Sequence, residues 1–268
     1  CGTDPATPPH SRGFAGHCAR GAPQLIRSAK NIRKTSTILI VVTSADTYAD
    51  KELKTGLWLS ELTHFYDLAR ANGFTVTLAS PHGGNTPIDP ESLKPLLLDK
   101  LSQKYPKKEG FMDQLRNTKK LEDVASESFD CVYLTGGHGM MYDFPEDLTL
   151  QDIIRAHFEN RKIVSAVCHG VGGLLNVKLS DGTYLIDGRV ISGYSWLEEW
   201  LARRNQKVPF NLEKELKRRG AVYKKPLIPL TSKAVEDVCL MTGQNPISSK
   251  ELAKNVVNRL RSIEGEQN

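Results

Sequence analysis

Four short and largely apolar runs, separated by segments of helical periodicity, constrain the fold of this chain more than any other feature. They cover residues 38–43, 74–79, 129–135 and 162–167. Such runs are typical of strands that are buried on both faces, as in a parallel sheet covered by helices. The sequence therefore predicts an α/β fold in which a mostly parallel sheet is sandwiched by helices.

The connections between these runs predict the helices. Apolar residues recur at helical spacing within residues 56–72. Residues 81–127 interrupt the alternation with a proline-bearing loop, and we interpret them as a helical insertion. A small hairpin is expected in TYLIDGRVISG, with its turn at the Asp-Gly pair. The other expected elements are helices at 91–103, 109–120, 148–160, from about 169, 195–204, 211–219 and 246–262, and a strand at 236–241.

The net positive charge lies in the first 35 residues. The whole chain carries 36 basic and 31 acidic residues, and residues 1–35 hold six of the basic and one of the acidic ones. The remainder is balanced, so its charge does not support a nucleic-acid-binding face. We expect residues 1–36 to form a disordered or loosely packed basic tail and residues 37–264 to form a single domain.

Cysteine usage and hydropathy bear on the location of the protein. The five cysteines, at positions 1, 18, 131, 168 and 239, are scattered without metal-ligand spacing. This favours a reducing compartment, and we predict a cytoplasmic protein. No apolar run approaches the ~20 residues that a membrane helix requires. Two alternatives stay open: an organelle transit segment within residues 1–36, or a lipid anchor on Cys1.

Cys168 is the candidate nucleophile, because a predicted buried strand runs directly into it. In KIVSAVCHGVGG the cysteine stands at a strand-to-helix turn, which is the layout of a nucleophile elbow. Open α/β folds bind ligands at this edge of the sheet, and a helix N-terminus there would favour the thiolate. His169 could serve the reaction through its ring or its backbone N–H. A buried structural cysteine is the alternative.

A second polar cluster follows the preceding strand, in LTGGHG. Gly136 and Gly137 leave the backbone bare enough to approach a substrate, and their N–H groups could hold an oxyanion. His138 could line the same pocket or could form a local hydrogen bond only.

Glu61 is the most informative carboxylate. On the predicted helix it shares a face with Leu57, Phe65 and Leu68. A carboxyl buried among such residues should have a raised pKa, which suits an acid–base group that faces a thiol. A boundary glutamate that turns to solvent is the alternative.

Several of these segments together resemble a known family. TGLWLSEL, SPHGGNTPIDPESL, TGGHG, AVCHG, ISGYSWLEEW and MTGQNP are similar to motifs of the ThiJ/PfpI superfamily, and in particular of its heat-shock-chaperone and glutathione-independent glyoxalase branch. The resemblance covers residues 37 to about 262. It implies a flavodoxin-like domain of the class I glutamine amidotransferase type.

The resemblance also implies roles for particular residues. It assigns the nucleophile to Cys168, the neighbouring histidine to His169 and the acid–base carboxyl to Glu61. The acid that orients the histidine aligns best with Glu199, and the neighbouring Glu198 is the alternative position for it. The oxyanion glycine corresponds to Gly137. Relatives often carry a small or polar residue in place of Trp196, which leaves the size of the pocket open.

The function implied by the resemblance is that of a glyoxalase III-type lyase, similar to D-lactate dehydratase, acting on a small reactive carbonyl compound. It would convert 2-oxoaldehydes such as methylglyoxal to 2-hydroxy acids without a cofactor or metal, and as a homodimer. A holdase chaperone, a cysteine peptidase and a protein deglycase are the alternatives within the superfamily. A glutamine amidotransferase is disfavoured, because no histidine follows His169 in the chain.

Overall fold

A seven-stranded sheet forms the centre of the fold. The computed structural model describes residues 35–50 and 52–266, which lie in the second of two units of the chain, residues 34–268. The strand order is β3-β2-β1-β4-β5-β9-β8, and every neighbouring pair is parallel except β8 with β9. The strands are β1 Thr37–Val41, β2 Thr75–Ser80, β3 Lys119–Lys120, β4 Cys131–Leu134, β5 Ile163–Val167, β8 Ala234–Asp237 and β9 Leu240–Gly243.

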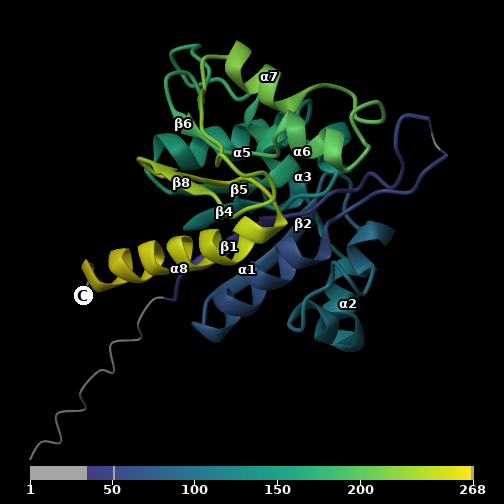
Figure 1. Ribbon diagram of the computed structural model, residues 1–268. Helices are drawn as coiled ribbons and strands as arrows, with labels where there is room; N and C mark the ends of the chain where they lie inside the picture. The colour runs from purple at the N-terminus through teal and green to yellow at the C-terminus, as the bar shows by residue number, and fades with distance from the viewer. Residues whose placement is uncertain (1–34, 51, 267–268) are drawn as a thin grey trace, which may run out of the picture. The chain divides into compact units, whose positions relative to one another are not determined.

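Helices cover both faces of this sheet (Figure 1). Helices α1 and α8 pack against each other on one face, and α5 packs on β4 and β5 on the other. None of the helices within the described ranges is both long and apolar enough to cross a bilayer. The helices are α1 Leu59–Ala71, α2 Glu109–Arg116, α3 Leu121–Val124, α4 Met140–Asp143, α5 Leu148–Glu159, α6 Trp196–Leu201, α7 Leu212–Arg218 and α8 Ser249–Glu266.

The central strands are buried on both faces, as their composition predicts. Every residue of β4 is fully buried, and so are the four residues of β1 that follow Thr37. Two aromatic rings join the sheet to α1, because Phe65 stacks on Tyr133 of β4 with 3.8 Å between ring centroids. The Tyr133 hydroxyl also donates to the carbonyl oxygen of Glu61. These contacts fix the first turn of α1 over the carboxyl end of β4.

The expected helix at 91–103 is wrong. Two short 3₁₀ helices, η1 Pro90–Leu93 and η2 Ser102–Lys107, occupy this region. Pro95 lies inside the predicted helix, where it lacks the backbone N–H and its ring clashes with the preceding turn. The helix expected at 109–120 is present as α2. It ends at Arg116, earlier than predicted, because residues 119–120 join the sheet as β3.

The small hairpin is also found elsewhere than expected. Within TYLIDGRVISG only β6 Val190–Ile191 is a strand, and it pairs in parallel with β7 Val222–Tyr223. The antiparallel hairpin is instead β8–β9, so the strand expected at 236–241 is two strands. Val238 in the turn has φ +59°, a conformation that β-branched residues rarely adopt, and composition therefore did not indicate a turn there.

The tail prediction falls mostly outside the described residues. At the start of the described chain, Ser36 donates through its backbone N–H and its hydroxyl to Glu264 of α8.

The strand order reverses between β1 and β4. In open α/β sheets, ligands bind outside the carboxyl ends of the strands at such a point.

Candidate active site

Cys168 stands directly at the carboxyl end of β5. It is the first residue of the 3₁₀ helix η3 Cys168–Leu174 and has φ +57°, which is unusual for a residue with a side chain. Strained backbone of this kind concentrates at functional sites. The side chain is 2% exposed, yet it lines a cavity. The predicted strand-to-turn placement is therefore present, with a 3₁₀ helix in place of the expected α-helix.

His169 connects the cysteine to Glu199. The Cys168 Sγ and His169 Nδ1 atoms are 3.2 Å apart, and His169 Nε2 lies 2.8 Å from Glu199 Oε2. Because a carboxylate only accepts, Nε2 carries the proton in the neutral ring, and Nδ1 is left to accept from the thiol. Of the two glutamates that the sequence left as candidates, Glu199 contacts the histidine.

Glu199 holds a second histidine. His138 Nε2 lies 2.9 Å from Glu199 Oε1, and the two histidine rings are 4.2 Å apart between centroids. His138 follows β4 and lines the cavity. Burial raises the pKa of Glu199, but His169 and His138 lower it more, so the net pKa is below its usual range. Burial and the neighbouring His138 lower the pKa of His169, which keeps its ring neutral at pH 7.

Glu61 lies on the other side of the cysteine. It sits in the first turn of α1 and is fully buried. A Cβ atom built on Gly136 would lie 2.0 Å from Glu61 Oε2 and 2.7 Å from Cys168 Cβ, so the carboxyl and the cysteine face the same point of the chain. The alternative of a glutamate that turns to solvent is thereby excluded.

The carboxyl and the thiol perturb each other. Burial raises the pKa of Glu61 to about 8, and the Cys168 side chain and the Gly136 backbone only partly oppose this. Burial and the adjacent Glu61 also raise the pKa of Cys168. The expectation that a helix N-terminus would favour the thiolate is therefore wrong. The helix is a short 3₁₀ turn, and desolvation and a carboxyl outweigh it.

The two glycines after β4 differ in position. Gly136 has no side chain, and this leaves room for Glu61 and Cys168 to lie close together. It is not among the residues that line the cavity. Gly137 does line the cavity and has φ +118°. A side chain at Gly137 would meet the carbonyl oxygen of Gly56 at 2.2 Å. The geometry thus leaves Gly137 as the better candidate for an oxyanion contact, and the role of both glycines stays a prediction.

The cavity that Cys168 lines has a volume of about 480 Å³. Trp196 is not part of its wall, so the tryptophan does not narrow it. Spacing in the sequence gave no signal for most of the wall, because the residues come from loops distant in the chain. The residues that the sequence did not single out include Tyr48, Asp89, Glu91, Leu96, Leu97, Tyr194, Arg204, Leu230 and residues 245–247.

Glu198 has a separate role that the sequence did not predict. It is fully buried and accepts hydrogen bonds from Ser195, the backbone N–H of Leu230 (2.9 Å), Gln244 Nε2 (2.7 Å) and Asn245 Nδ2 (2.8 Å). Leu230 and Asn245 line the cavity. Glu198 therefore fixes the cavity wall, while its neighbour Glu199 faces the histidines.

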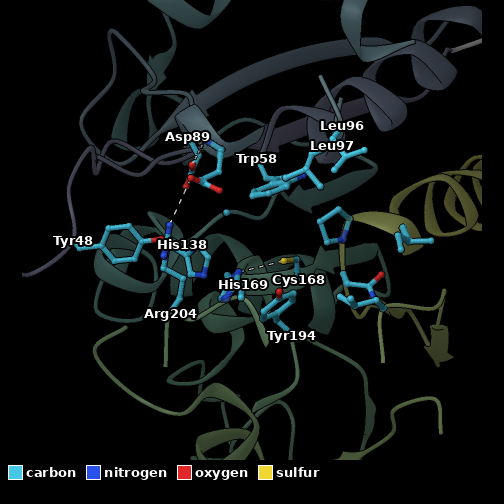
Figure 2. Close-up of a pocket in the computed structure, with 17 residues that line it drawn as sticks. Tyr48, Trp58, Asp89, Leu96, Leu97, His138, Cys168, His169, Tyr194 and Arg204 are labelled. Carbon is cyan, nitrogen blue, oxygen red and sulfur yellow. Dashed lines mark hydrogen bonds and ion pairs between the residues drawn. The ribbon is translucent and has the colours of Figure 1, made fainter. Parts of the chain in front are cut away.

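His138, His169 and Glu199 could also serve as metal ligands, since their ligand atoms lie within 4.8 Å of one another. Two of these contacts are already hydrogen bonds to Glu199. The arrangement fits a cysteine–histidine–glutamate triad with a second histidine, and Figure 2 shows Cys168, His169 and His138 at the cavity.

Residues 53–259 match the DJ-1/PfpI family. The chain belongs to that family. The family resemblance and the flavodoxin-like α/β fold expected from the sequence are both confirmed by the family match and by the solved structures.

Similar proteins cover most of this DJ-1/PfpI chain. The glutathione-independent glyoxalase hsp3102 of Schizosaccharomyces pombe is 28% identical over 246 residues, which are 86% of this chain and 100% of the relative. The X-ray structure of rapid encystment protein 24 kDa from Francisella tularensis aligns with a TM-score of 0.81 at 33% identity, over 84% of this chain and 99% of that one. Glyoxalase III of Candida albicans aligns with a TM-score of 0.76 at 28% identity, over 83% and 96%.

Proposed function

We propose that this DJ-1/PfpI protein is a glutathione-independent glyoxalase that converts 2-oxoaldehydes, such as methylglyoxal, to 2-hydroxy acids. One observation carries the proposal: Cys168 lies between the buried Glu61 carboxyl and the His169–Glu199 pair. The glyoxalase relatives in Schizosaccharomyces pombe and Candida albicans support it.

The thiol and the carboxyl act together in the first step. Glu61 loses its proton with a pKa of about 8, and the pair then holds one proton on the Cys168 sulfur, because the pKa of that thiol is raised well above its usual range. The Glu61 carboxylate takes the Cys168 thiol proton as the sulfur attacks the aldehyde carbon, and the Glu61 carboxyl then gives this proton to the aldehyde oxygen. A hemithioacetal forms and Glu61 becomes a carboxylate. Gly137 is proposed to donate its N–H to the oxygen on which charge develops.

Glu61 then moves a proton between two carbons. Its carboxylate takes the hydrogen from the former aldehyde carbon, and the electron pair passes to the ketone oxygen to give an enediolate. The carboxyl returns the proton to the adjacent carbon, while the hydroxyl proton passes to the former ketone oxygen. The product is a 2-hydroxyacyl thioester on Cys168. A buried carboxyl with a raised pKa is a stronger base than an exposed one, which suits this step.

Water completes the reaction. His169, oriented by Glu199, accepts a proton from the water that attacks the thioester carbonyl, and the Cys168 sulfur leaves. The 2-hydroxy acid is released and the thiol is restored. One water is added overall, so the chemistry requires neither glutathione nor a redox cofactor. His138 is proposed to contact the substrate and to keep Glu199 in place.

The finer parts of the proposal are a lyase of the glyoxalase III type, similar to D-lactate dehydratase, a homodimeric assembly and a cytoplasmic location. The proposed dimer rests on the family resemblance, and the proposed location rests on the cysteine usage.

A holdase chaperone is the second candidate function, because several large apolar side chains are exposed. They are Leu197, Trp200, Leu201, Leu227 and Ile228.

Glutathione-free turnover of methylglyoxal to lactate tests the proposal. Wild type should form lactate, and Cys168→Ala should form none above the uncatalysed rate. Cys239→Ala, which removes a buried thiol on the β8–β9 turn, is the matched control and should keep activity. Lactate formation by Cys168→Ala would overturn the mechanism. If wild type forms no lactate and both variants suppress aggregation of a denatured protein equally well, the holdase function is favoured instead.

A further inference from the structure

The cavity is larger than a three-carbon aldehyde requires. Its volume of about 480 Å³ falls in the range of roughly 300–1,000 Å³ that is typical of sites for drug-sized ligands. Methylglyoxal bound to Cys168 would leave most of this space to solvent. The remaining wall is therefore free to contact the rest of a longer substrate.

One end of the cavity is polar, and the proposed reaction uses only one of its residues. We define this polar end as Tyr48, Asp89, Glu91, His138 and Arg204, all of which line the cavity. Figure 2 shows Tyr48, Asp89 and Arg204 around His138 on one side of the cavity, with Leu96 and Leu97 on the other side. The polar end therefore lies where the remainder of a longer substrate could extend.

The members of the polar end are held by one another and by nearby loops. Arg204 Nη2 lies 3.7 Å from Glu91 Oε1, and Arg204 Cζ is 5.9 Å from the centre of the Tyr48 ring. The Tyr48 and His138 rings are 5.5 Å apart between centroids. Asp89 accepts from the Thr55 hydroxyl at 3.1 Å and from the backbone N–H of Glu91. The set is thus preorganised, which lowers the entropic cost of binding.

The charged side chains at the polar end determine which substituents of a substrate it can bind. Two acidic side chains, Asp89 and Glu91, line this end with one guanidinium, and Lys94 outside the wall pairs with Glu91 at 2.6 Å. The positive and negative charges are therefore balanced, and the end offers no excess positive charge to an anionic substituent. The carboxylates accept hydrogen bonds, and the guanidinium and the phenol donate them. A hydroxyl group both donates and accepts, so several hydroxyls on adjacent carbons can use such a mixed set.

We propose that the polar end binds the hydroxyl groups of a sugar-derived 2-oxoaldehyde, whose aldehyde carbon is attacked by Cys168. The substrate class then includes polyhydroxylated 2-oxoaldehydes of about six carbons. This inference rests on the proposed glyoxalase function. The bond changes are those of the short substrate: one water is added, and the 2-oxoaldehyde becomes a 2-hydroxy acid with its hydroxylated chain intact.

The test compares 3-deoxyglucosone with methylglyoxal as substrates of the full chain. The quantity of interest is the ratio of kcat/KM for 3-deoxyglucosone to kcat/KM for methylglyoxal. In Arg204→Met and in Tyr48→Phe this ratio should fall, by about ten-fold or more for Arg204→Met because a hydrogen bond to a charged group is lost. Leu96→Ala, at the opposite end of the same cavity, is the matched control and should not lower the ratio.

The outcomes separate this inference from the function on which it rests. Wild-type turnover of methylglyoxal without turnover of 3-deoxyglucosone would overturn the inference and leave the glyoxalase proposal standing. Unchanged ratios in both polar-end variants would do the same. No turnover of either substrate by wild type would overturn both. Thermal unfolding of each variant checks that a fall in the ratio does not come from a damaged fold.

Discussion

Replacing Glu61 with glutamine should remove a pH-dependent loss of stability. The carboxyl is fully buried, and neither oxygen has a hydrogen-bond partner of ordinary geometry among the described residues. Burial raises its pKa to about 8. As pH rises, the unfolded chain therefore releases this proton before the folded protein does. The folded state binds more protons across this interval, so the free energy of unfolding must fall with rising pH.

The size of this effect follows from the pKa values. Each pH unit between about 4.5 and 8 costs the wild-type protein about 1.4 kcal/mol, and glutamine does not titrate. Between pH 5 and pH 7.5 the wild-type free energy of unfolding should fall by about 3 kcal/mol more than that of Glu61→Gln. Asp143, whose pKa is raised to about 6, contributes to both proteins and cancels in the difference.

Urea denaturation at pH 5, 6, 7 and 7.5 measures the difference. Glu236→Gln is the matched control, because Glu236 is exposed on β8 and its replacement should leave the curve parallel to that of wild type. If the wild-type and Glu61→Gln stabilities change in parallel with pH, the Glu61 carboxyl is already ionised in the folded protein and the reasoning fails.

Three further predictions concern the same site. The kcat/KM for methylglyoxal should rise about ten-fold per pH unit up to about pH 8, because the pair must lose its first proton, and a flat profile from pH 6 to 8 would contradict this. Gly136→Ala should lower both thermal stability and lactate formation, because its Cβ would lie 2.0 Å from Glu61 Oε2 and 2.8 Å from the Val167 carbonyl oxygen; an active, equally stable variant would refute it. Glu198→Gln should destabilise the protein by about 3 kcal/mol in urea denaturation, because an amide cannot accept from all its present donors, and a change under 1 kcal/mol would contradict the assigned role.

The sheet was predictable because its strands are chemically distinctive. Residues 38–43 and 162–167 are apolar enough to be buried on both faces, and β1 and β5 are found there. The placement of Cys168 at a strand end followed from this alone. The predicted helix at 91–103 does not form, because Pro95 lacks a backbone N–H and its ring clashes with the preceding turn.

The site was predictable only in part. Adjacent residues such as Cys168 and His169, and a carboxyl on an apolar helix face such as Glu61, leave a local signal. The prediction that a helix N-terminus favours the Cys168 thiolate is wrong, because the pKa of the thiol depends on tertiary burial that spacing in the sequence does not reveal. The polar end of the cavity left no signal either, since Tyr48, Asp89 and Arg204 come from three separated loops.

Lactate formation by Glu61→Gln at saturating methylglyoxal tests the central claim most directly, namely that the buried carboxyl beside Cys168 moves the carbon-bound proton. A folded Glu61→Gln protein should lose at least about a hundred-fold in kcat, the lower end of what general acid–base catalysis contributes. A kcat within a few-fold of wild type would contradict the claim.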